Sequence, residues 1–283
     1  MRDLLELIKP RITALILICT AVGYLFGPSN SLHLAAFVHV LLGAGLMASG
    51  TAALNQWYEA DSDAMMRRTC KRPIPAGRMK RSHGFAFGML LSAAGFADLW
   101  LGTNALAAEL GLFTLASYIL LYTPLKRRSA ACTTIGALPG AMPPVIGYAA
   151  SSGVLDAKAL SLLLILFVWQ FPHFYAIALM YREDYARGGI RMLPVIEPDG
   201  ESTARRIVAC SLLLIPISLV PQLAGMTGSV YTVAALVAGL GLLGMGVRLR
   251  TERTFARARQ VLLASVLYLP VVLTAMVLDR RAP

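Results

Sequence analysis

The sequence predicts an all-α integral membrane protein in which nine transmembrane helices surround a central cavity open to the cytoplasmic side. Composition supports this fold class, because 57% of the 283 residues are hydrophobic and only 14% are charged. A soluble domain carries about 25% charged residues. The distribution of Lys and Arg along the chain supports the same topology. The connections between apolar stretches are short, so we expect residues 1–283 to form a single domain in the lipid bilayer.

The chain contains nine apolar stretches, and a membrane-spanning helix needs roughly 20 apolar residues. The first stretch has no convincing small-residue cleavage site, so we expect it to remain as a span and not to be removed as a signal peptide. The predicted spans cover residues 12–27, 33–56, 83–101, 104–121, 131–150, 158–180, 207–225, 229–247 and 260–278.

Basic residues are concentrated on one side of the predicted membrane. Nine spans place 23 of the 26 Lys and Arg residues on the side of the N-terminus, and only Lys158, Arg280 and Arg281 on the other. This alternation matches the positive-inside rule. It predicts a cytoplasmic N-terminus and an external C-terminus. The net charge of +11 is then explained by topology, and we expect no nucleic-acid partner. The four cysteines show no paired spacing, so we expect no disulfide framework.

Opposed charges gather where the second predicted span ends. At about 100° per residue, Asn55, Glu59 and Asp63 lie on one stripe of a helix, whereas Asp61 lies off it. Carboxylates at this spacing repel each other, and a divalent cation would reverse the sign of that interaction. Oxygen ligands without His or Cys favour Mg²⁺, which completes its shell with water and phosphate oxygens. The alternative is an ordinary charged interface loop whose acids and bases pair with each other.

Basic residues follow this acidic stripe directly. Arg67, Arg68, Lys71 and Arg72 provide partners for phosphate, Arg through a fork of donors and Lys as a point charge. A second cluster, "YREDYARGG", ends the sixth predicted span on the same side of the membrane. Two such helix ends that face each other would enclose a complex of metal and diphosphate, with the active site on the cytoplasmic side.

Several motifs resemble those of a known family. "NQWYEADSD" resembles the first Asp-rich motif of the UbiA superfamily of intramembrane prenyltransferases, and "RRTCKRPIPAG" is similar to its continuation. "YTPLKRRS", "WQFPHFYAIAL" and "YREDYARGGIRMLPV" resemble the protoheme IX farnesyltransferase (heme O synthase) branch. The chain departs from many relatives in having Glu59 for Asp. It also has Gly188 where the wider superfamily has a second acid four positions after Asp184.

The resemblance implies Mg²⁺-dependent transfer of farnesyl from farnesyl diphosphate to a vinyl group of heme B, giving heme O and diphosphate. A bacterial inner-membrane location and handover of the product to heme A synthase or to terminal oxidase assembly are expected with it. The implied catalytic residues are Asn55, Glu59, Asp63 and Asp184, which would also hold the metal, together with His173. The implied substrate-binding residues are Arg67, Lys71, Arg72, Tyr122, Lys126, Arg127, Arg182 and Glu183.

Two of these residues have a simple structural alternative. Tyr122 could present its ring face to a carbocation, or it could be one of the aromatic residues common at membrane interfaces. His173 follows Pro172 within a span. It could contact the porphyrin or its iron, transfer a proton, or only form a hydrogen bond to a carbonyl that the proline frees.

Other functions remain open at the level of sequence. The acceptor could be an aromatic acid or another compound, because only the His173 motif indicates heme. A transporter of heme or another anion is the main non-enzymatic alternative, but transporters place coupling residues near the midplane of the bilayer. Here nearly all charges lie at one interface. A heme chaperone would need the heme pocket but not the acidic stripe.

Overall fold

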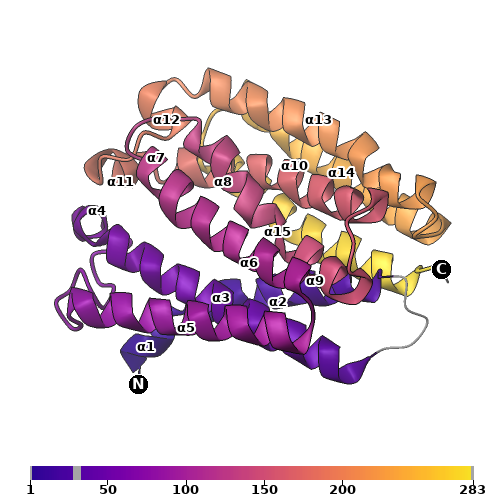
Figure 1. Ribbon diagram of the computed structural model, residues 1–283. Coiled ribbons are helices and arrows are strands. Elements are labelled where there is room, and N and C mark those ends of the chain that lie inside the picture. The colour runs from indigo at the N-terminus through magenta and orange to yellow at the C-terminus, as the bar shows by residue number, and fades with distance from the viewer. Residues whose placement is uncertain (1, 28–32, 282–283) are drawn as a thin grey trace. The chain divides into compact units, whose positions relative to one another are not determined.

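A computed structural model describes residues 2–27 and 33–281 (Figure 1). Within these residues the regular structure is helical and contains no β-strand, which confirms the predicted all-α class. The helices form two compact units. The first comprises Met1–Val154 and Glu183–Arg191, and the second comprises Leu155–Arg182 and Met192–Pro283.

The first unit is built on the packing of α3 against α5 and of α2 against α9. Small residues allow backbones to approach closely in membrane helices. A Cβ atom at Gly95 would lie 2.7 Å from the carbonyl oxygen of Gly43, and one at Gly147 would lie 1.9 Å from that of Thr20. The elements are α1 (Arg2–Leu7), α2 (Pro10–Leu25), α3 (Leu34–Tyr58), α4 (Ala60–Met65), α5 (Arg81–Gly102), α6 (Ala105–Ala116), a π-helix (Ser117–Tyr122), α7 (Thr123–Leu125), α8 (Cys132–Ala141), α9 (Pro143–Ser152) and α11 (Arg182–Arg187), whose first residue belongs to the second unit.

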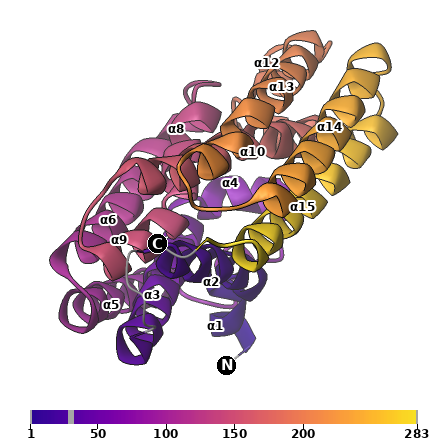
Figure 2. The ribbon, with the colours of Figure 1, turned by 90° about the vertical axis from the view of Figure 1, so that its right-hand side faces the viewer.

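The second unit is arranged around α10, which packs against α13 and α15. Figure 2 shows α13, α14 and α15 side by side. A hydrogen bond of 2.8 Å from Trp169 Nε1 to the carbonyl oxygen of Ser265 ties α10 to α15. The elements are α10 (Ala157–Met180), α12 (Leu193–Ile196), α13 (Glu201–Leu223), α14 (Ser229–Thr251) and α15 (Phe255–Leu278).

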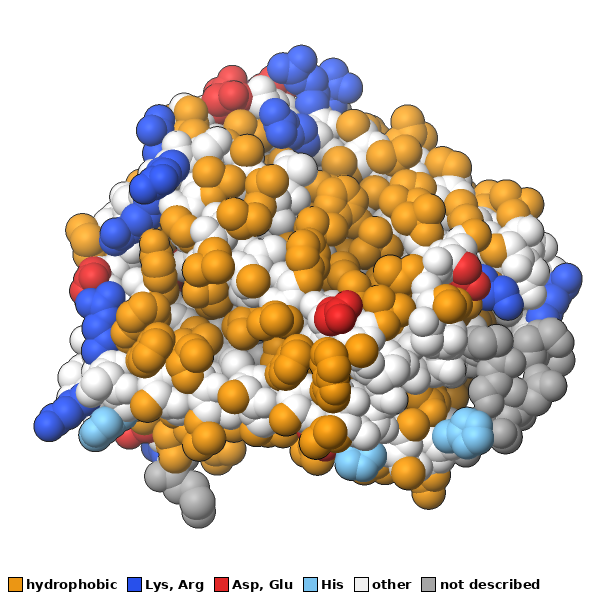
Figure 3. Space-filling view, in the orientation of Figure 1, with side chains coloured by type: hydrophobic (Ala, Val, Ile, Leu, Met, Phe, Trp, Pro, Cys, Tyr) orange, Lys and Arg blue, Asp and Glu red, His pale blue; other side chains and the backbone are white. Residues whose placement is uncertain are grey.

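Seven helices of the described chain are long and apolar enough to cross a membrane. Their outer faces carry exposed apolar side chains such as Leu101, Leu223 and Leu278, and Figure 3 shows hydrophobic groups spread over one face. A lipid environment accounts for this exposure. The candidates are Leu34–Tyr58, Arg81–Gly102, Ala105–Leu125, Ala157–Met180, Glu201–Leu223, Ser229–Thr251 and Phe255–Leu278.

Two of the nine predicted spans are helical but are not full-length spans. α2 has 16 residues, which gives about 24 Å at 1.5 Å per residue, less than the roughly 30 Å of a hydrocarbon core. The stretch 131–150 is divided into α8 and α9 at Met142. Pro143 follows Met142, and proline lacks the N–H that a continuous helix would use. The nine-span count therefore stays a prediction. All four cysteines are free.

Candidate active site

The predicted acidic stripe lies where α3 passes into α4. Glu59 separates the two helices, yet the helical hydrogen bonds continue through it. Its N–H donates to the carbonyl of Asn55 at 2.9 Å, and the N–H of Asp63 donates to the carbonyl of Glu59 at 2.8 Å. Asn55 and Asp63 are buried. Asp61 is exposed and bonds to Arg81 instead. The local helical spacing thus puts three oxygen-bearing side chains on the inner face and one on the outer face.

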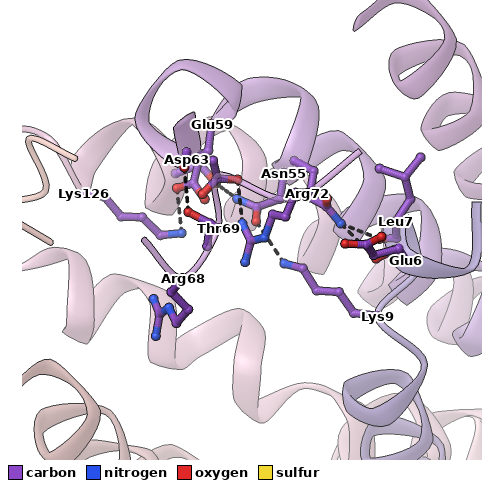
Figure 4. A network of polar contacts seen from close by, with 12 residues as sticks. Glu6, Leu7, Lys9, Asn55, Glu59, Asp63, Arg68, Thr69, Arg72 and Lys126 are labelled. Carbon is purple, nitrogen blue, oxygen red and sulfur yellow. Dashed lines mark hydrogen bonds and ion pairs between the residues drawn. The ribbon is translucent and has the colours of Figure 1, made fainter. Parts of the chain in front are cut away.

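Each carboxylate of the stripe has its own cation (Figure 4). Lys126 Nζ lies 2.8 Å from Glu59 Oε1, and Arg72 Nη1 lies 2.5 Å from Asp63 Oδ2. The acids and bases therefore pair, as the alternative of an ordinary interface loop expects. Burial separates the two interpretations, because Asp63 is only 1% exposed and Lys126 only 8%. Burying charges costs several kcal/mol even when they are paired, and an ordinary loop would leave them solvated.

Lys9 is a third cation at the stripe. The sequence indicated for it only a contribution to the positive charge that predicts membrane topology. Lys9 Nζ donates to Asn55 Oδ1 at 3.3 Å. Two features place it there. Gln56 Nε2 donates to the carbonyls of Glu6 and Leu7, which anchors α1. Lys9 itself adopts a left-handed backbone conformation with φ 48°, immediately before Pro10 starts α2. The sequence feature that marks this position is that Lys9 directly precedes Pro10, the proline that begins α2.

The electrostatics of the stripe reflect an excess of positive charge. Burial raises the pKa of Glu59, but Lys126 outweighs it and holds that pKa below its ordinary value. For Asp63 burial prevails over Arg72, and its pKa is raised. Burial, with Arg72 and Lys126 nearby, lowers the pKa of Lys9 to about 7. Two carboxylates among three cations can accept a further anion.

The donor set fits a hard cation such as Mg²⁺. Asp63 Oδ1 is buried and has no hydrogen-bond partner among the described residues. A buried oxygen without a partner is costly, and a bound ion is one of the features that explain it. In the described part of the chain no three His, Cys, Asp or Glu side chains are grouped closely enough to hold an ion. Mg²⁺ keeps several waters and uses one or two carboxylates, so Glu59, Asp63 and the amide of Asn55 are a sufficient protein contribution.

The second acidic cluster lies against the loop that follows the first. Asp184 Oδ1 accepts a hydrogen bond of 3.2 Å from the backbone N–H of Arg67 and pairs with Arg187. Arg187 outweighs burial and lowers the pKa of Asp184. Arg68 stacks on the Tyr185 ring at 5.1 Å and donates to its hydroxyl. Asp184 is thus attached to the same loop as the stripe, and it is held by basic residues of its own.

The other predicted substrate-binding residues occupy different settings. Lys126 Nζ lies 4.3 Å from the centre of the Tyr122 ring, so Tyr122 has a cation–π contact. The π-helix that ends at Tyr122 was not predicted, although such segments are frequent at functional sites. Arg127 donates to Ser62 Oγ at 2.9 and 2.5 Å. Exposed side chains are found at Arg67, Lys71, Arg182 and Glu183, and Arg182 donates to the carbonyl of Pro198.

His173 lies in α10 of the second unit, in uncharged surroundings. Its Nδ1 is 3.0 Å from Ser265 Oγ. Its ring stacks on Trp169, with 5.0 Å between ring centres and 24° between planes. The hydrogen bond therefore goes to a hydroxyl on another helix and not to a carbonyl freed by Pro172.

Comparison with known proteins establishes the family. The model of the UbiA prenyltransferase family matches residues 16–269. The chain belongs to this family. A protein from Solibacter usitatus named protoheme IX farnesyltransferase is 57% identical, over 99% of both chains. A solved structure of digeranylgeranylglyceryl phosphate synthase shares the fold, with a TM-score of 0.82, 16% identity and coverage of 98% and 97%. A UbiA homologue from Archaeoglobus fulgidus bound to GPP and Mg²⁺ has a TM-score of 0.65 at 14% identity, covering 97% of this chain and 99% of that one.

Family membership and the seven apolar helices together make the chain a multi-pass membrane protein.

Proposed function

We propose that the chain is a protoheme IX farnesyltransferase, which transfers farnesyl from farnesyl diphosphate to a vinyl group of heme B. The observation that carries prenyl transfer is the buried stripe of Asn55, Glu59 and Asp63 among Lys9, Arg72 and Lys126. An allylic diphosphate can ionise only if the leaving diphosphate is stabilised, and this stripe has the charges to do so. The choice of heme B as acceptor is supported by the name of the relative at 57% identity.

Asn55, Glu59 and Asp63 would hold Mg²⁺, with Asp184 as a further ligand. Bound Mg²⁺ supplies Lewis-acid stabilisation of the leaving diphosphate. The unpartnered Asp63 Oδ1 supports this role. With Glu59 and Asp63 as metal ligands, Lys126 and Arg72 would be available to donate to phosphate oxygens. Lys9, Arg67, Lys71 and Arg127 would be further phosphate donors, and Arg182 and Glu183 stay predicted substrate-binding residues.

The reaction then balances as follows. The bond between C1 of farnesyl and the diphosphate oxygen breaks, and its electron pair leaves with diphosphate. The allylic cation bonds to the terminal carbon of the vinyl group. Water adds to the neighbouring carbon and loses a proton, which gives the hydroxyl of heme O. The ring face of Tyr122, beside Lys126, is a suitable neighbour for the developing cation.

We further propose that residues 1–283 act as a single UbiA-like domain in a bacterial inner membrane. Its N-terminus would be cytoplasmic, its C-terminus external, and its cavity would open to the cytoplasm. The nine spans would include α2 and the interrupted pair α8 and α9. The asymmetric distribution of Lys and Arg supports this orientation. Handover of heme O to heme A synthase or to oxidase assembly is the expected next step.

The test uses the purified full-length protein in detergent with farnesyl diphosphate, heme B and Mg²⁺. We expect release of pyrophosphate and a heme product whose mass has increased by farnesyl plus water, with both lost in excess chelator. Full turnover in chelator would remove the metal from the proposal. Transfer of farnesyl to an aromatic acid but not to heme B would replace the acceptor. Heme flux into vesicles by the same protein after reconstitution, without a covalent product, would support a transporter.

A further inference from the structure

The hydrogen bonds around Ser265 determine which nitrogen of His173 carries the proton. Ser265 Oγ lies 2.7 Å from the carbonyl oxygen of Leu262 and 3.0 Å from His173 Nδ1. A hydroxyl has one proton, and a carbonyl can only accept. The serine proton therefore goes to Leu262. Its oxygen lone pair then faces His173, so Nδ1 must be the donor. Neutral His173 is the Nδ1–H tautomer, and the lone pair is on Nε2.

Trp169 fixes the plane of the same ring. Its indole N–H donates to the backbone carbonyl of Ser265 at 2.8 Å, and its ring stacks on the imidazole. Ser265 is completely buried, whereas His173 is only partly buried. Ser265 of α15 thus accepts from both Trp169 and His173 of α10, which leaves the imidazole with a defined orientation.

A proton relay through Ser265 is a poor explanation for this arrangement. Within the described chain, the ring of His173 makes its one hydrogen bond to Ser265. A relay through that serine would end at the carbonyl of Leu262, which has no proton to pass on. A neutral imidazole whose second nitrogen donates to a fixed acceptor is instead the usual arrangement of a metal-bound histidine.

We propose that Ser265 and Trp169 are positioning residues that present Nε2 of His173 to the iron of heme B. This inference rests on the proposed function, because it takes heme B as the acceptor substrate. His173 is the axial ligand of the substrate iron. Ser265 selects its tautomer, and Trp169 sets its ring plane.

The first experiment follows ferric heme B bound to the full-length protein in detergent by absorption and electron paramagnetic resonance. We expect His173→Ala to remove the histidine signature, and added imidazole to restore it. His173→Gln, which keeps a polar side chain of similar length, serves as the second variant. An unchanged spectrum in folded His173→Ala or His173→Gln protein would overturn the assignment.

The second experiment compares Ser265→Ala with Ser211→Ala. Both remove a fully buried hydroxyl from the second unit, but that of Ser211 has no hydrogen-bond partner in the described chain. We expect Ser265→Ala to weaken heme binding about tenfold. We also expect it to raise the midpoint potential of the bound heme, because an imidazole that has lost its acceptor is a weaker electron donor. Ser211→Ala should change neither quantity. Equal effects of the two variants, or no effect of Ser265→Ala, would contradict the positioning role.

Farnesyl transfer is measured separately on the same preparations. Heme O formation by His173→Ala with an unchanged heme spectrum would reject iron ligation and leave the proposed function intact. Wild-type protein that ligates heme through His173 but makes no heme O would reject the function and leave the ligation intact.

Discussion

Buried polar side chains are compensated by charge at the acidic stripe and by neutral contacts around His173. At the stripe, each carboxylate is compensated by a full opposite charge, as in the pairs Glu59–Lys126 and Asp63–Arg72. Around His173 the contacts are a hydroxyl and the rings of Trp169 and Phe174, and among the described residues no ion pair involves the imidazole. Charges can exchange partners when an ionic ligand enters. A neutral hydrogen-bonded imidazole keeps its lone pair for a metal.

The difference matches the two substrates of the proposed reaction. A diphosphate brings negative charge, so its site must hold cations that are temporarily neutralised by the protein's own carboxylates. A heme iron needs an uncharged nitrogen, and a nearby ammonium or carboxylate would change the basicity of that nitrogen. Variants that alter charge should therefore act strongly at the stripe and leave heme ligation unaffected.

The largest expected effect is that of Asp63→Asn. This substitution removes a proposed metal ligand and deprives Arg72 of its partner, while the size of the side chain is kept. We expect about a 10³-fold loss in the rate of pyrophosphate release, with an unchanged spectrum of bound heme B.

Asp61→Asn is the matched control, two positions away. Asp61 is exposed and bonds to Arg81, so the loss of this surface pair should change the rate by less than about twofold. Equal losses in both variants would mean that general surface charge, and not the stripe, drives the reaction.

Local spacing was enough to predict the stripe, but contacts between distant segments were not predictable. Asn55, Glu59 and Asp63 share one side because of helical periodicity, which can be calculated from the spacing of residues in the sequence. The positions of Lys9 and Ser265 depend on partners 46 and 92 residues away. Periodicity carries no information about such pairs.

Backbone departures escaped prediction for a related reason. Apolar periodicity does not register the π-helix Ser117–Tyr122, nor the interruption at Met142 that follows from the missing N–H of Pro143. Helix type and most span positions were therefore predictable from composition, whereas the three-dimensional surroundings of each site residue were not.

A smaller effect is expected from Lys9→Met. This variant tests whether a cation of the stripe without a carboxylate partner also serves the diphosphate. Among the described residues Lys9 bonds to the amide of Asn55 and to no carboxylate, so of the three cations at the stripe it is the one that can bind diphosphate without breaking an ion pair. A hydrogen bond to a charged group contributes about 1.5–3 kcal/mol. Because this interaction would be present before and during ionisation, we expect the KM for farnesyl diphosphate to rise about tenfold with little change in kcat.

Arg11→Met provides the control for Lys9→Met, because Arg11 is an exposed cation of the same N-terminal segment. Its KM should match that of the wild type. An equal rise in KM for both variants would assign the effect to long-range attraction by net charge, and a fall in kcat alone would make Lys9 part of the ionisation step.

The smallest effect on catalysis is expected at the opposite end of α3, where His39 Nδ1 lies 2.8 Å from Asp98 Oδ1 of α5. Asp98 Oδ2 is buried without a partner in the described chain, so His39→Leu would leave a poorly solvated carboxylate. We expect it to destabilise the protein by about 1–3 kcal/mol and to lower the melting temperature in detergent.

The double variant His39→Leu/Asp98→Leu should recover most of this loss. The rate per folded molecule should stay at the wild-type value in both, because this pair is neither at the stripe nor bonded to His173. A lower rate at full folding would show that a polar pair at the other end of α3 influences the reaction. The contrast between a charged diphosphate site and a neutral heme site would then be too simple.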